Sequence, residues 1–266
     1  MKQILHIYAK DVRRFLPEIL IVLSLVAAYV SINCYLSATD PQFRIGRIEP
    51  GGKLATLLPL LIGFIHFAWI LLVCRVIQAE RLVGDTQFWI TRPYEWKKLI
   101  AAKLLFVGTF VYLPVLAGFF ILRAKSGPPL HPEVATSFLG GVGDVLFYIT
   151  VLVLFAAAIA TVTSNIARMM AGILYAFISM IVVTLIPAEM RPDSVPGPLT
   201  VKICYALFFL LCGAAILLQY ARRKTRFSIS LLIAIPVLIC VVSIFTPERR
   251  PSGRIQPSHV TVTRPK

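Results

Sequence analysis

Long apolar runs alternate with short polar segments along most of this chain. Each run is close to or above the roughly 20 residues that a helix needs to cross a bilayer. The pattern therefore predicts an all-α polytopic membrane protein with about seven transmembrane helices. The expected spans are residues 17–36, 54–77, 99–122, 138–162, 167–186, 201–220 and 228–245.

The N-terminal segment, residues 1–16, has a different pattern from the spans that follow it. Apolar side chains such as Ile4, Tyr8 and Phe15 recur at helical spacing, whereas Lys10 and other basic residues occupy the opposite positions. This amphipathic pattern predicts an interfacial helix that lies on the cytoplasmic surface of the membrane. The alternative is a solvated lead-in to the first span.

The remaining polar segments divide the chain without creating a second folded domain. All the spans fall within one transmembrane domain, residues 17–245. The tail at 246–266 is polar, contains four prolines and has no periodic apolar face, so we expect it to be extended or disordered. With a cytoplasmic N-terminus, an odd number of spans places this tail outside the cytoplasm. One span more or fewer would place the tail on the opposite side of the membrane.

Composition strengthens the membrane interpretation. The chain of 266 residues is 58% hydrophobic and 15% charged, with a mean hydropathy of +0.82. A soluble domain of this size has too little interior to hide that much apolar surface. A net charge of +15 would by itself suggest a nucleic-acid partner. The basic residues, however, cluster at the ends of the apolar runs, so we expect a lipid bilayer and no nucleic acid.

The distribution of basic residues also predicts orientation. Basic residues are in excess at the N-terminus, around 75–103 and at 222–226, and such segments face the cytoplasm. We therefore expect an integral protein of the bacterial inner (plasma) membrane with a cytoplasmic N-terminus.

A polar stretch at 78–103 is more elaborate than a simple connection between spans requires. It contains helix-forming segments with a break at Gly84 and another before Pro93. Glycine permits a sharp change of direction, and proline ends a helix. Asp85 or Thr86 is suited to cap the helix that lies between these breaks.

The same stretch carries an aromatic pair and a row of lysines. Phe88 and Trp89 offer a large apolar anchor for a groove on a partner, which predicts a cytoplasmic docking loop at 78–98. The alternative is a helix that only anchors the loop in lipid, with Trp89 and Tyr94 at the membrane interface. We expect the start of the third span to be held at the lipid headgroups by its basic residues, which are Lys97, Lys98 and Lys103.

The chain carries none of the short motifs that mark nucleotide binding or catalysis. It has no GxxxxGK(S/T) loop, no HExxH pattern and no recognisable Ser-His-Asp grouping. The five cysteines lack CxxC spacing, and at least four fall inside apolar runs, which is typical of small core residues. We therefore expect no catalytic residue, no metal and no cofactor in this chain.

His66 lies near the middle of the second expected span, in the sequence GFIHFAWI. A polar side chain at that depth requires a partner and sometimes marks a transport pathway. His66 is therefore a candidate pathway residue. The alternative is a histidine that is hydrogen-bonded to a neighbouring helix.

The polar stretch also contains an ordered set of residue types. An acidic residue comes first, followed by a Gly-Asp-Thr step and then by an apolar pair. A proline preceded by a basic residue comes next, and a lysine follows about ten positions after that proline. These positions are Glu80, Gly84, Asp85, Thr86, Phe88, Trp89, Arg92, Pro93 and Lys103. The pattern resembles the loop between the second and third spans of type-2 ATP-binding-cassette (ABC) transporter permeases. The amphipathic N-terminus and the short turn at 163–172 are also similar to that family, and the likeness covers about residues 1–220.

The resemblance implies a membrane-spanning permease subunit of an ABC transporter. In that family a second permease subunit completes a homo- or heterodimer, and a separate ABC ATPase subunit docks on the cytoplasmic face and receives a coupling helix. Closure of the ATPases then switches the pathway between inward-facing and outward-facing states. The mostly apolar spans favour lipid-like or amphipathic cargo, and we expect export rather than import.

The chain also departs from the family. Family members usually have six spans and a re-entrant hairpin before the last one, whereas here that linker is short and proline-rich and a further span follows. The resemblance therefore assigns no substrate. The rival interpretation is a non-transporting membrane scaffold or assembly factor that docks a cytoplasmic partner through the same loop. A polytopic enzyme acting on lipid is disfavoured because paired acidic or histidine groups are lacking.

Overall fold

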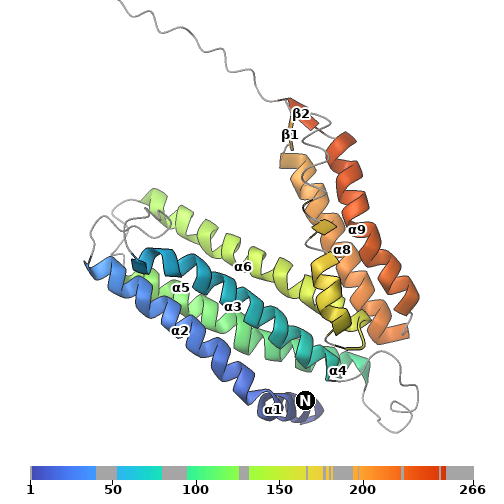
Figure 1. Cartoon of the computed structure of the whole chain (residues 1–266), viewed down its shortest axis with the longest axis horizontal. Helices are drawn as coiled ribbons and strands as arrows, with labels where there is room; N and C mark the ends of the chain where they lie inside the picture. Colours follow the sequence, from blue (N-terminus) through green and yellow to red (C-terminus); the bar gives the residue numbers. More distant parts are fainter. Residues whose placement is uncertain are drawn as a thin grey trace, which may run out of the picture.

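The computed structural model describes most of the chain, and nearly all of the described residues are helical (Figure 1). The described residues are 2–39, 53–79, 95–125, 132–165, 167–175, 178–179, 181, 194–196, 198–222, 225–245 and 247–249. The helical fold predicted from the apolar runs is confirmed.

The helices follow one another along the chain. The first three are α1 (Lys2–Arg14), α2 (Leu16–Thr39) and α3 (Lys53–Gln78). One continuous helix then consists of α4 (Trp96–Val107), the π-helical turn η1 (Gly108–Tyr112) and α5 (Leu113–Lys125). The remaining elements are α6 (Pro132–Val162), a helical segment at 167–175, strand β1 (Ser194–Pro196), α8 (Pro198–Arg222), α9 (Thr225–Phe245) and strand β2 (Pro247–Arg249).

Among the described residues, six helices are long and apolar enough to cross a membrane. They are Leu16–Leu36, Leu57–Gln78, Trp96–Lys125, Gly141–Val162, Leu199–Ala221 and Thr225–Phe245. These six agree with six of the seven expected spans. The other expected span, 167–186, is helical at 167–175, and much of the rest lies outside the described residues.

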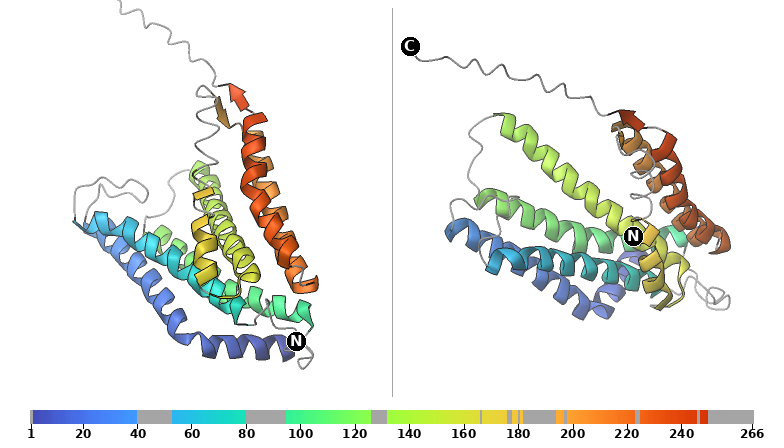
Figure 2. Two further views of the ribbon diagram at one scale, coloured as in Figure 1. Left: turned by 45° about the vertical axis from the view of Figure 1, so that its right-hand side comes forward. Right: turned by 45° about the horizontal axis from the view of Figure 1, so that its top comes forward.

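The long helices form a bundle with a hairpin attached to one side. α3 packs against both α2 and α6, and α5 packs against α2. α8 and α9 pair with each other and contact the bundle through α6. Figure 2 shows this hairpin set at an angle to the bundle, so that α6 and α8 converge near α1 and diverge toward their first residues.

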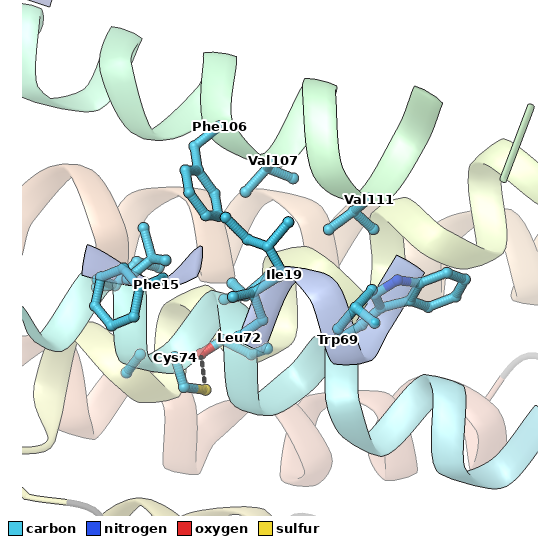
Figure 3. Packing of buried hydrophobic residues seen from close by; sticks show 14 of the residues in the cluster. Phe15, Ile19, Trp69, Leu72, Cys74, Phe106, Val107 and Val111 are labelled. Atoms are coloured by element: carbon cyan, nitrogen blue, oxygen red, sulfur yellow. Dashed lines mark hydrogen bonds between the residues drawn. The ribbon is translucent and has the colours of Figure 1, made fainter. Parts of the chain in front are cut away.

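The bundle core is built from large apolar side chains of several helices. Phe15, between α1 and α2, and Ile19 of α2 meet Leu72 of α3, and the continuous helix contributes Phe106 and Val111 (Figure 3). Each of these side chains is 2% exposed or less. The core therefore joins the N-terminal end of α2 to the end of α3 and to the α4–η1 segment.

The outer surface of the bundle is also apolar. Leu60 and Phe64 of α3 are 61% and 62% exposed, and Leu104 of α4 is 67% exposed. In water such a surface would be an aggregation liability, whereas in a bilayer it meets acyl chains. The exposed apolar residues therefore agree with an integral membrane protein.

The π-helical turn η1 lies just before Pro114. Proline has no N–H to donate to the carbonyl of the preceding turn, and its ring crowds that turn. A π turn accommodates the mismatch within a continuous helix. The turn also presents Tyr112, whose hydroxyl donates to Oγ1 of Thr150 in α6 at 2.8 Å, so the irregular backbone ties this helix to α6.

Strands β1 and β2 pair antiparallel beyond the hairpin, with Val195 opposite Glu248. They join the residues that precede α8 to those that follow α9. The sequence analysis did not predict this pairing. Within the tail expected at 246–266, the described residues are those of β2.

Gly118 marks a close approach between α5 and α2. A Cβ atom on Gly118 would lie 3.0 Å from Cγ2 of Val30, whereas one on Gly63 would meet no atom within 4 Å. We expect Gly118→Leu to destabilise the protein by about 1–3 kcal/mol because the added side chain must push the two helices apart. Gly63→Leu is the matched control. Thermal unfolding of both variants in detergent measures the difference, and equal stability would contradict tight packing at Gly118.

Candidate functional site

The segment that carries the family resemblance is described only at its two ends. α3 ends at Gln78, and Glu95 immediately precedes α4. The predicted coupling residues between these points lie outside the described residues; they are Glu80, Gly84, Asp85, Thr86, Phe88, Trp89, Arg92 and Pro93. The structure instead describes the loop base, by which we mean α1, the last turns of α3 and the first turns of α4.

A buried ion pair joins α1 to α4 at the loop base. Nζ of Lys103 lies 2.7 Å from Oδ2 of Asp11, and the two side chains are 7% and 0% exposed. A buried charge is costly when it is alone, so each group requires the other. Asp11 depends on the ammonium of Lys103 in particular, because the other carboxylate oxygen of Asp11, Oδ1, is buried without a hydrogen-bond partner.

This arrangement corrects the role expected for Lys103. The sequence suggested that its ammonium contacts lipid headgroups at the start of the third span. In the structure the ammonium faces a carboxylate inside the protein. Lys103 therefore fastens α1 to α4, because a charge buried among apolar residues finds its partner in the protein rather than at the membrane surface.

The apolar side of α1 faces the bundle. Ile7 is 3% exposed, and the ring of Tyr8 lies 6.4 Å from that of Phe106 and 6.3 Å from that of Phe110. Arg13 on the opposite side is exposed. The predicted amphipathic helix is therefore present, but its apolar side packs largely on the α4–η1 helix.

The end of α3 is tied to α2 at the loop base. Nη1 of Arg75 lies 3.4 Å from Oε1 of Glu18 in α2. The guanidinium of Arg75 also lies 5.9 Å from the ring centre of Phe15, and that of Arg14 lies 5.6 Å from the same ring. Because the side chains of Arg75 and Glu18 are 48% and 28% exposed, this ion pair is weak.

One hydrogen bond ties the last turn of α3 to the end of α6. Nε2 of Gln78 donates to Oγ1 of Thr163 at 2.9 Å. Thr163 begins the tight turn predicted at 163–165, which the structure confirms. Oδ1 of Asn165 caps the next helical segment by accepting from the backbone N–H of Arg168 at 2.8 Å. Both neighbours of α3 therefore hold its end in place.

The first turn of α4 has a more exposed set of contacts. Nζ of Lys98 lies 3.0 Å from Oε1 of Glu95, and Nζ of Lys97 lies 5.7 Å from the ring centre of Trp96. Lys97 is exposed and Lys98 is partly exposed. A headgroup contact for these two lysines stays a prediction.

The segments that the sequence analysis assigned to one side of the membrane lie at one end of the molecule. Contacts bring together α1, the end of α3, the start of α4 and the end of α6. The last residues of α8 and the first residues of α9 lie at the same end (Figure 1). This shared end agrees with the predicted topology, which rested on charge alone.

His66 lies on α3 at the boundary with α6 and is partly exposed. Its ring lies 5.6 Å from that of Trp69 and 5.3 Å from that of Tyr148 in α6, both edge-on. These contacts place His66 away from the loop base, within an aromatic group that joins α3 to α6.

The sequence analysis missed the Asp11–Lys103 pair, although a signal was present. Asp11 falls on the same helical stripe as Ile4, Tyr8 and Phe15, which is the apolar side of its helix. Lys103 likewise lies inside an apolar run. A charge on an apolar stripe requires a partner, but nothing in the local pattern identifies a partner 92 positions away.

The described residues bring together no group of three or more His, Cys, Asp and Glu side chains that could hold a metal ion. Comparison of the chain with protein-family models, with curated proteins and with solved structures found no match.

Proposed function

We propose that this protein is the permease subunit of an ABC transporter and that the loop base transmits the movement of a docked ATPase to the spans. The observation that carries the proposal is the way in which both ends of the polar stretch are held. The end of α3 is tied to α2 and α6, and the start of α4 is tied to α1. A displacement of the loop therefore moves packed helices instead of being lost in a flexible connection.

In this proposal the loop base faces the cytoplasm of a bacterial inner membrane. A separate ABC ATPase subunit receives the coupling helix, with Phe88 and Trp89 as its anchor. A second permease subunit, identical or related, completes the pathway, and amphipathic cargo moves outward. The basic ends of the helices and the family resemblance support this orientation.

The test is a co-purification from native membranes in mild detergent, followed by identification of the proteins that bind ATP. We expect an ABC ATPase to be recovered with the chain and its ATP hydrolysis to change when the permease is present. Failure to recover a nucleotide-binding partner in several detergents would contradict the proposal.

A membrane scaffold is the second candidate, because a rigid loop base would also suit the static docking of a cytoplasmic partner. The two candidates differ in what the partner does. A bound partner that hydrolyses no ATP, or whose hydrolysis is unchanged by the permease, would favour the scaffold.

A further inference from the structure

An acidic residue and two aromatic residues share one side of α6, far from the loop base. Asp144 is exposed and lies within the span Gly141–Val162. Phe147 and Tyr148 follow it by three and four residues, so the three side chains are neighbours on the helix surface. Helical side chains lean toward the N-terminus of their helix, so both rings lean toward the turn that carries Asp144.

The two rings connect this side of α6 to both neighbouring helices. Tyr148 lies edge-on to His66 of α3 at 5.3 Å between ring centres. Phe147 lies edge-on to Tyr205 of α8 at 4.7 Å. We refer to Asp144, Phe147, Tyr148, His66 and Tyr205 as the aromatic–acid face.

The aromatic–acid face is accessible from outside the protein. Tyr148 is 54% exposed, and Phe147 and Tyr205 are each 41% exposed. The divergence of α6 and α8 toward their first residues, visible in Figure 1, is consistent with this exposure. The face is therefore a surface that another molecule can reach and not part of the core.

The charge of Asp144 determines what kind of molecule would cover it. Among the described residues, no basic side chain forms an ion pair with Asp144, whereas Glu18, also in a span, is paired with Arg75. A carboxylate within a span is costly unless a cation accompanies it. Aromatic rings near such a carboxylate attract a cation through their π faces. The same rings also bind the apolar body of a ligand through their large contact area. Together these groups suit a monovalent organic cation with a large apolar body.

We propose that the aromatic–acid face binds lipophilic organic cations, with Asp144 as the counter-charge and Phe147, Tyr148 and Tyr205 as the aromatic surroundings. As an assignment of cargo class, this inference rests on the proposed transporter function. The binding itself requires no ATPase, so it is measurable with the permease chain alone.

The experiment uses two probes of nearly equal shape and opposite charge, the tetraphenylphosphonium cation and the tetraphenylborate anion. Equilibrium dialysis against the purified chain in phosphatidylcholine nanodiscs measures binding, with empty nanodiscs subtracted as the lipid background. We expect saturable binding of the phosphonium that the borate does not inhibit. Asp144→Asn is expected to weaken that binding by about tenfold or more.

Two matched variants make the outcome specific. Asp144→Glu keeps the charge and is expected to keep the affinity within about threefold. Glu95→Gln removes one acidic charge at the loop base and is expected to leave the binding unchanged. Size-exclusion profiles show whether each variant is folded. If the asparagine variant is not folded, the comparison of the phosphonium with the borate on the wild-type chain decides the role of the charge.

Equal binding of the two probes, absence of saturable phosphonium binding, or an unchanged affinity in Asp144→Asn would each overturn the inference. None of these results bears on the docking of an ATPase. Conversely, if the chain binds the phosphonium but no ATPase is recovered with it, the result would support cation binding at the aromatic–acid face and contradict the proposed transporter function. The two failures are therefore distinguishable.

Discussion

Replacing Lys103 with methionine is expected to lower the free energy of unfolding by about 3–5 kcal/mol. The substitution leaves the carboxylate of Asp11 at 0% exposure without its counter-charge, and Oδ1 of that carboxylate already lacks a hydrogen bond. The cost therefore includes the burial of an unpaired charge as well as the loss of an attraction. Denaturant titration in detergent, followed by tryptophan fluorescence, measures this change.

A double substitution separates these two contributions. Asp11→Leu combined with Lys103→Met replaces the pair with apolar groups of similar size, and we expect it to recover most of the stability lost in the single variant. Lys98→Met is the matched control, because its partner Glu95 is 65% exposed and an exposed pair contributes at most about 1 kcal/mol. A single Lys103→Met variant no less stable than this control would show that the pair does not hold α1 to α4.

The double variant also allows a functional question to be asked of a stable protein. If α1 must be fastened to α4 for loop movement to reach the spans, apolar packing alone should suffice. We therefore expect the double variant to keep the stimulation of the proposed ATPase partner, which the unstable single variant would lose.

Replacing both Phe88 and Trp89 with alanine is expected to abolish recovery of the proposed ATPase partner while the spans remain inserted. Aromatic anchors at interfaces commonly contribute about 2 kcal/mol or more each, so losing both should weaken the complex by at least about two orders of magnitude. A complex weakened that far dissociates during purification. Co-purification from membranes, with equal amounts of the wild-type and variant chains, measures the effect.

The control for this variant is a second pair of aromatic residues on the outer surface. Phe64 and Phe67 of α3 are 62% and 47% exposed and lie away from the loop base. Their joint replacement with alanine is expected to leave ATPase recovery unchanged. If Phe88→Ala/Trp89→Ala also left it unchanged, the coupling assignment would be wrong and lipid anchoring would be the better interpretation of this pair.

The positions of the spans followed from the sequence because crossing a bilayer is a local requirement. A run such as 57–78 is long enough and apolar enough to be a membrane helix whatever its neighbours are. The amphipathic helix α1 and the turn at 163–165 were predictable for the same reason, since their patterns lie within a few residues. The charge asymmetry that orients the chain is likewise a property of short segments.

The contacts between helices were not predictable in this way. Lys103 with Asp11 and Gln78 with Thr163 are separated by 92 and 85 positions. In each case the sequence shows a polar residue near or inside an apolar run, and several partners are chemically possible. The choice depends on which faces of which helices pack together. Seen from the sequence alone, Lys103 therefore belonged with the lysines at the membrane surface.

The sequence by itself determined that this is a helical membrane protein, where six of its spans lie and which polar stretch deserves mutation. Only the tertiary structure decided that α1 is fastened to α4, that α3 is tied at its end to α2 and α6, and that Tyr148 and Phe147 of α6 contact His66 of α3 and Tyr205 of α8. The physical reason is that lipid exposure acts on each helix separately. Helix pairing instead depends on side chains that are distant along the chain and meet only when the bundle has assembled.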